Sequence, residues 1–84
     1  MAEVNIRYRG TLAGLINKEE ERITAETVRE VLAHIKTAYG AAAGKTAKSM
    51  LIVVDGESIH LRGGFATRLK EGETLQFLPI CGGG

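Results

Sequence analysis

Residues 27–40 read TVREVLAHIKTAYG and predict one well-delimited amphipathic helix, around which the other elements can be arranged. Thr27 and Glu30 have the spacing of a capping box, in which both side chains satisfy backbone amides at a helix N-terminus. The apolar residues recur at helical spacing and form one stripe: Val28, Val31, Leu32, Ile35 and Tyr39. Gly40 is a natural helix end. No other segment is a convincing helix, so the remaining elements are expected to form a sheet on which this stripe packs.

Upstream of the helix, apolar and polar residues alternate with the two-residue period of a half-buried strand. The apolar members are Val4, Ile6 and Tyr8. Gly10 follows as a turn signal, and residues 11–17 are predicted to be a loop that leads into a second strand. Residues 19–24 are interpreted as the far half of that strand, and their run of charged side chains is expected to form a solvated face.

Downstream, three strands are expected, over residues 50–54, 58–61 and 74–78. Asp55-Gly56 is a strong hairpin signal between the first two of them. Pro79 cannot donate a ladder hydrogen bond, so the last strand should end there. The order strand, strand, helix, strand, short strand, strand predicts an α+β domain, with a mixed sheet packed on one main helix.

Composition limits the function. The 84 residues allow one small domain, which argues against a self-contained enzyme with a deep active site. A formal net charge of +1 does not favour nucleic acid as a partner. The single cysteine excludes an internal disulfide framework. The N-terminal residues lack a long apolar region, and the longest apolar run, residues 50–54, is too short for a bilayer. A cytoplasmic protein without a membrane partner is therefore expected.

The sequence ends in Cys81-Gly82-Gly83-Gly84. Glycines accept almost any backbone conformation, and ordering them costs more entropy than ordering other residues. Such a tail contributes little to a fold, but it suits a partner enzyme with a narrow channel to a reactive centre. The terminal carboxylate is therefore predicted to be the reactive group of this protein.

Residues 77–83 read FLPICGG and resemble the F-x-P-x-x-G-G ending of ubiquitin-like sulfur carriers. That family includes the small subunit of molybdopterin synthase and the sulfur carrier of thiamin biosynthesis. Residues 27–32, 53–57 and 69–75 are weaker echoes of the same family. The resemblance implies a single β-grasp, ubiquitin-like domain over residues 1–79, followed by a flexible glycine tail over residues 80–84.

The resemblance also implies a carrier that is not itself an enzyme and binds no cofactor. A ubiquitin-activating-like enzyme would use ATP to adenylate the terminal glycine, and a persulfide sulfurtransferase would supply the sulfur of a thiocarboxylate. Molybdopterin biosynthesis is the first expectation, and there a large synthase subunit would accept the tail. Thiamin, a thiolated RNA base and a sulfur-containing amino acid are the other clients considered.

One departure from the family concerns the last residue. The family ends in two glycines, so either Gly84 carries the chemistry directly or a protease removes it and Gly83 does; direct use is favoured. The expected partner-binding residues are Phe77, Pro79, Ile80, Cys81 and Gly82. Phe77 is given a mixed role in the core and at a partner surface, and Pro79 is expected to stiffen the tail exit. Cys81 is interpreted as a small apolar residue, with a thiol that pairs with a partner enzyme as the alternative.

Two further functions stay open: a protein modifier that is conjugated to lysines, and a non-covalent interaction module. Residues 40–46 read GAAAGKT, but only three residues separate the two glycines where a phosphate loop has four, so a plain, mobile loop is expected. His34 and His60 have no partners at metal-ligand spacing and are expected to be structural or solvent-facing. No metal site is predicted.

Overall fold

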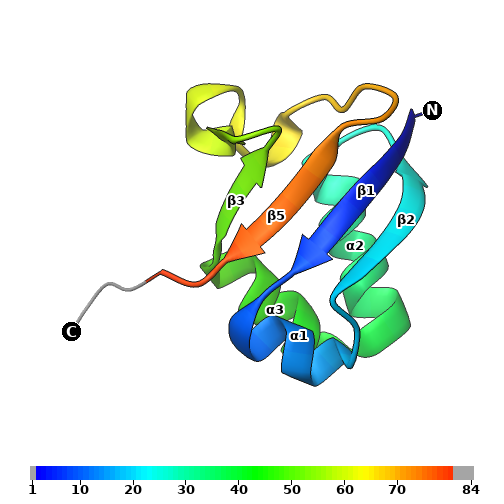
Figure 1. Cartoon of the computed structure of the whole chain (residues 1–84), viewed down its shortest axis with the longest axis vertical. Helices are drawn as coiled ribbons and strands as arrows, with labels where there is room; N and C mark the ends of the chain where they lie inside the picture. The colour runs from blue at the N-terminus through cyan, green and yellow to red at the C-terminus, as the bar shows by residue number, and fades with distance from the viewer. Residues whose placement is uncertain (1, 81–84) are drawn as a thin grey trace.

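A five-stranded mixed sheet lies against a layer of helices in the computed structural model, which describes residues 2–80 (Figure 1). The strands are β1 (Ala2–Tyr8), β2 (Glu20–Ala25), β3 (Leu51–Val54), β4 (Glu57–Ser58) and β5 (Thr74–Leu78). They lie in the order β2-β1-β5-β3-β4, and only the central pair, β1 and β5, is parallel. The predicted mixed sheet is thus confirmed, and it places the end of the last strand beside the end of the first.

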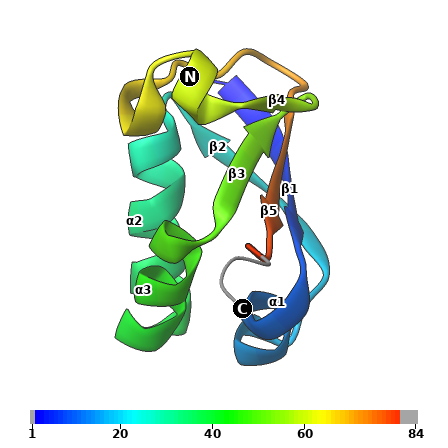
Figure 2. The same cartoon turned by 90° about the vertical axis from the view of Figure 1, so that its left-hand side faces the viewer.

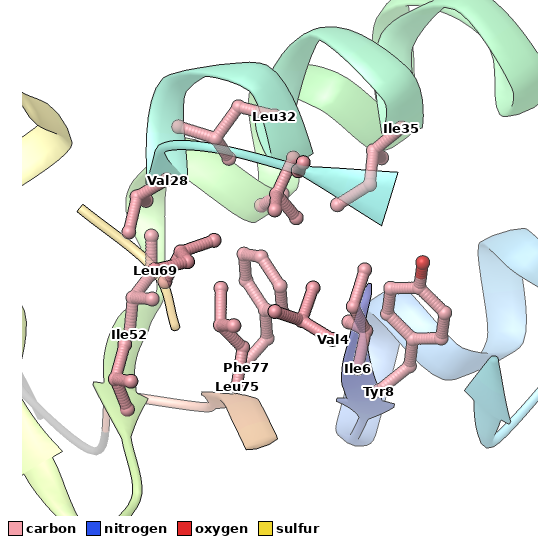
Figure 3. Close-up of a cluster of buried hydrophobic side chains, with 14 of the residues drawn as sticks. Val4, Ile6, Tyr8, Val28, Leu32, Ile35, Ile52, Leu69, Leu75 and Phe77 are labelled. Carbon is pink, nitrogen blue, oxygen red and sulfur yellow. The ribbon is translucent and has the colours of Figure 1, made fainter. Parts of the chain in front are cut away.

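The main helix, α2 (Val28–Tyr39), forms where the sequence predicts it. The Thr27 hydroxyl accepts a hydrogen bond from the Glu30 backbone N–H (3.3 Å). The Glu30 carboxylate accepts a hydrogen bond from the backbone N–H of Glu26 (2.9 Å). In a standard capping box it would accept from the N–H of the N-cap residue itself, Thr27. Four apolar residues of α2 are buried: Val28, Val31, Leu32 and Ile35. The side chains of Val28 and Ile35 point from α2 toward the sheet (Figure 3).

The loop predicted over residues 11–17 is wrong, because α1 (Gly10–Ile16) forms there. Leu12 and Ile16 lie one helical turn apart and are both buried, which supplies the apolar contact that holds so short a helix. Asn17 ends the helix in the left-handed conformation (φ 63°), and its N–H donates to the Ala13 carbonyl (2.8 Å).

The mobile loop predicted over residues 40–46 is also wrong. A third helix, α3 (Ala41–Ser49), follows α2 after a break at Gly40, whose φ of 103° no helix accommodates. Ala43 and Ala47 are buried one turn apart, so the small alanines form the packing face of α3. Because α3 follows a helix and precedes a strand, the rejection of a phosphate loop stands.

The hairpin between β3 and β4 is confirmed, with positive φ at both Asp55 (49°) and Gly56 (84°), as a type I′ turn requires. The predicted return strand over residues 58–61 is too long, because β4 ends at Ser58. The short 3₁₀ helix η1 (Ile59–Leu61) then turns the Ile59 side chain into the core. A second one, η2 (Gly64–Ala66), contacts α2.

The core lies between α2 and the inner face of the sheet (Figure 3). The sheet contributes the buried side chains of Val4, Ile6, Tyr8, Ile52, Val54, Leu75 and Phe77. Within residues 2–80 no helix has the length and apolarity that crossing a bilayer would need.

Candidate functional site

The base of the C-terminal tail lies where β5 ends, next to α1 (Figures 1 and 2). Pro79 follows Leu78 and ends the strand as predicted, since a proline has no N–H to donate. Ile80 is 62% exposed. The remaining predicted site residues, Cys81, Gly82, Gly83 and Gly84, lie outside the described part of the chain.

The Phe77 side chain lies wholly in the core, with no exposed surface. Its ring stacks on that of Tyr8, with the centroids 6.0 Å apart and the planes at 25°, and the two residues are neighbours in the β1–β5 register. The partner-facing half of the mixed role predicted for Phe77 is therefore wrong. Phe77 instead anchors the strand from which the tail departs.

Pro79 lies against Gly10, the first residue of α1. Gly10 is in the left-handed region (φ 58°), and a Cβ placed on it would stand 3.6 Å from the Cγ of Pro79. The continuing parallel register of β1 and β5 brings these two residues together. The sequence identifies Gly10 as a turn, but the contact depends on strand order and has no local signal.

A pair of leucines that sequence reasoning missed lies on the opposite face of the sheet from Phe77. Leu51 of β3 and Leu78 of β5 are direct cross-strand partners, and both are half-buried. The continuous apolar run of residues 50–54 hides the alternation that would have separated Leu51 from its inward neighbour Ile52. This outer leucine pair and the exposed Ile80 provide an apolar surface at the base of the tail.

A network of polar side chains, here called the Glu21 cluster, joins Tyr8, Lys18, Glu21, His34 and Tyr39. The hydroxyls of Tyr8 and Tyr39 donate to Glu21 Oε2 (2.6 Å) and Oε1 (2.7 Å), respectively. His34 Nε2–H donates to Oε2 (2.9 Å), and Lys18 Nζ lies 3.5 Å from Oε1. Glu21 thus ties β2 to β1 and to α2 at one point.

These contacts set the ionisation of the cluster. Partial burial alone would raise the pKa of the Glu21 carboxyl above its ordinary value of 4.5. The hydrogen bonds from Tyr8, Tyr39 and His34 outweigh burial and hold the pKa of Glu21 at about 2. Burial and the hydrogen bond to Glu21 raise the pKa of Tyr8 well above its usual range. At neutral pH Glu21 is therefore an anion that accepts hydrogen bonds, and the Tyr8 hydroxyl is a neutral donor, which suits a structural clamp rather than proton transfer.

The Glu21 cluster supports the tail base through Tyr8, whose hydroxyl binds Glu21 and whose ring stacks on Phe77. The solvated face predicted for residues 19–24 is wrong at Glu21, whose side chain is only 12% exposed. His34 has a structural role, as expected, and its ring meets that of Tyr39 edge-on. His60 is exposed. Among residues 2–80 no three potential metal-ligating side chains gather.

The fold and the tail base define the class of protein: a ubiquitin-like β-grasp domain with parallel central strands, whose last strand leads directly into the C-terminal segment. The sequence profile of the ThiS family matches residues 6–84. The chain therefore belongs to the ThiS family of ubiquitin-like sulfur carriers.

Solved structures agree with this assignment. Small archaeal modifier protein 1 from Methanosarcina acetivorans is 25% identical with a TM-score of 0.85, over 100% of this chain and 98% of that one. The Amycolatopsis orientalis BexX/CysO complex contains a chain of the same fold, 20% identical with a TM-score of 0.80, over 96% and 99%. A chain in the complex of molybdopterin-converting factor subunits 1 and 2 from Helicobacter pylori is 24% identical, with a TM-score of 0.69, over 96% and 99%. Among curated protein sequences there is no match.

Proposed function

We propose that this protein carries sulfur on its C-terminal glycine, which a partner enzyme adenylates and a sulfur donor converts to a thiocarboxylate. The observation that carries the proposal is the extent of the family match. It runs from residue 6 to residue 84, so it includes the glycine tail as well as the folded domain.

The chemistry explains why a partner is needed. A free α-carboxylate has a pKa of ~3.5, so it is ionised at neutral pH and is a poor electrophile. Reaction with ATP, held by a ubiquitin-activating-like enzyme, makes an acyl-adenylate and releases pyrophosphate. The persulfide of a sulfurtransferase displaces AMP and forms an acyl disulfide. A thiol that cleaves the S–S bond leaves the thiocarboxylate, whose sulfur then passes to the client molecule.

The geometry of the tail base favours this use of the tail. Phe77 is locked in the core, and Pro79 rests on Gly10, so the residues that follow leave the domain from a defined position. The outer leucine pair, Leu51 and Leu78, gives an activating enzyme an apolar surface beside that exit. Binding there would aim the glycines toward the enzyme's ATP without any change in the fold.

Molybdopterin biosynthesis is the proposed client pathway, and a large synthase subunit is the proposed acceptor of the thiocarboxylate. In the Helicobacter pylori complex, the two subunits of the molybdopterin-converting factor bind each other. A matching large subunit should bind this chain through the same apolar surface, which is formed by the outer leucine pair and Ile80.

The working glycine can be assigned with two chains, one ending at Gly84 and one ending at Gly83. Direct use of Gly84 predicts that the full sequence releases pyrophosphate with the activating enzyme and ATP without prior proteolysis. If only the chain ending at Gly83 is adenylated, Gly84 must first be removed.

A protein modifier is the second candidate function. The small archaeal modifier protein from Methanosarcina acetivorans matches the whole of this chain at 25% identity, which favours this alternative over a plain interaction module. In that case a lysine amine attacks the activated glycine and forms an isopeptide bond. Lysines that carry a remnant of the glycine tail in digests of cells would support it, and their absence alongside a thiocarboxylate would exclude it.

A further inference from the structure

A groove of about 470 Å³ is lined by residues of α2, α3 and η2. Helices α2 and α3 lie side by side on one side of the sheet (Figure 2). Leu32 and Phe65 contribute apolar surface to it, and Phe65 is 39% exposed. The two helices approach closely at Gly44, where a Cβ would stand only 3.0 Å from the Cβ of Lys36. Gly44 and Lys36, where the helices approach, both line the groove.

Four cations line this groove: Arg29, Lys36, Lys45 and Lys48. None of the four forms an ion pair with any residue in the range 2–80, and no carboxylate lines the groove. The segment 28–49 carries these four cations and the single carboxylate of Glu30, a net charge of +3 against +1 for the whole chain. The positive charge of the protein is thus concentrated on one face, which attracts anions.

The spacing of the cations indicates the shape of the anion. Arg29 and Lys36 are separated by two turns of α2, or ~10 Å along its axis, and Lys45 and Lys48 by about one turn of α3. One phosphate group cannot reach charges that far apart. Carboxylates that repeat once per helical turn on a second helix can.

We propose that this groove binds an acidic amphipathic helix of a partner protein. Apolar side chains of the partner would enter between α2 and α3 and contact Leu32 and Phe65. Its carboxylates would lie beside Arg29 and Lys36 on one side and beside Lys45 and Lys48 on the other. This is the helix-in-groove mode of recognition, with charge complementarity setting specificity.

The groove is separate from the tail base, because none of its lining residues belongs to the sheet or to the outer leucine pair. A partner held there leaves the tail free for an activating enzyme or an acceptor. The proposal therefore does not depend on the chemistry of the tail, and a carrier, a modifier and an interaction module would all be recruited in this way.

The test uses a synthetic helical peptide of about four turns, with leucines along one face and glutamates on both flanks. Binding is followed by NMR amide shifts of the labelled protein and by fluorescence anisotropy of the peptide at several salt concentrations. We expect saturable binding, shifts confined to residues 28–49 and 64–66, and affinity that falls as salt rises. The double variant Lys45→Glu/Lys48→Glu should weaken binding at least tenfold, whereas Lys70→Glu, an exposed lysine outside the groove, should not.

Phe65→Ser provides the apolar half of the test, because it should weaken binding without changing the salt dependence. A peptide with lysines in place of the glutamates is the matched probe and should not bind. The proposal is overturned if the acidic peptide does not saturate, or if its shifts fall on the sheet. It is also overturned if ATP or inorganic polyphosphate binds the same residues more tightly than the peptide, which would make the groove a small-anion site.

Discussion

Gly10 and Pro79, the residues just beyond the two central strands, lie against each other, and a Cβ on Gly10 would stand 3.6 Å from the Pro79 Cγ. The parallel register of β1 and β5 puts them there, far apart as they are in sequence. The start of α1 is consequently the surface against which the chain turns as it leaves the sheet.

Gly10→Ala should lower the free energy of unfolding by about 1–2 kcal/mol, because a side chain at φ 58° is strained. Gly14→Ala is the matched control within the same helix. A Cβ at Gly14 meets nothing within 4 Å, so this change should be neutral or stabilise by up to ~1 kcal/mol. Urea unfolding measures both, and equal effects of the two substitutions would refute the special conformation of Gly10.

Substitutions at Phe77 and at Ile80 should have different effects, the first on the stability of the domain and the second on partner binding. Phe77→Ala removes a fully buried ring and should destabilise the domain by ~3–5 kcal/mol, a large part of the stability of so small a protein. Ile80→Ala removes an exposed side chain and should change stability by less than ~0.5 kcal/mol.

The Ile80→Ala protein should nevertheless be adenylated more slowly at limiting activating enzyme, because Ile80 belongs to the apolar surface that is proposed to bind the enzyme. A rate of pyrophosphate release equal to that of the unchanged chain would remove Ile80 from the interface.

Glu21 should make stability depend on pH in acid. Its folded pKa of about 2 lies below its ordinary value of 4.5, so the ionised carboxyl stabilises the fold above pH ~4.5. This contribution should be lost as the pH falls from about 4.5 toward 2. Glu21→Gln should therefore destabilise the protein by roughly 1–3 kcal/mol at pH 7, through weaker hydrogen bonds, and should show little of this acid dependence.

Glu20→Gln is the control for this prediction, since the Glu20 side chain is exposed on the other face of the same strand. Thermal unfolding from pH 7 to pH 2 gives the comparison. A Glu21→Gln curve parallel to that of the unchanged protein would show that the cluster does not control acid stability.

The outcome of sequence reasoning differs between local and long-range features. The stripe of α2, the alternation of β1 and the Asp55-Gly56 turn are local signals strong enough to predict a mixed sheet packed on one main helix, whereas the strand order is a long-range feature that only the structure gives. Helix α3 was missed because its packing face is made of alanines, which carry almost no hydrophobic signal, and α1 because one pair of residues, Leu12 and Ile16, carries its pattern.

The predicted site is the C-terminal tail, and the residues that the structure describes include only its base, up to Ile80. The FLPICGG ending identifies where chemistry is expected, but nothing in it says that Phe77 is wholly buried or that Pro79 rests on Gly10. The Glu21 cluster was hidden because a carboxylate in a run of charged residues has the same local pattern whether it is solvated or clamped by two tyrosines from other elements.

Gly83→Ala should sharply lower adenylation and leave stability unchanged, because a methyl group beside the terminal glycine would clash in a narrow enzyme channel. Pyrophosphate release and urea unfolding of the same protein check the two halves of this prediction. Normal adenylation of the folded variant would show that the channel does not require glycine there.

Intact mass spectrometry after reaction with the activating enzyme, ATP and a persulfide donor shows whether sulfur is carried on the last glycine. Fragmentation must locate the change, because oxidation of Met50 or Cys81 adds nearly the same mass. We expect the exchange of one oxygen for one sulfur, confined to the terminal glycine. Steady pyrophosphate release with no sulfur at that glycine would contradict it.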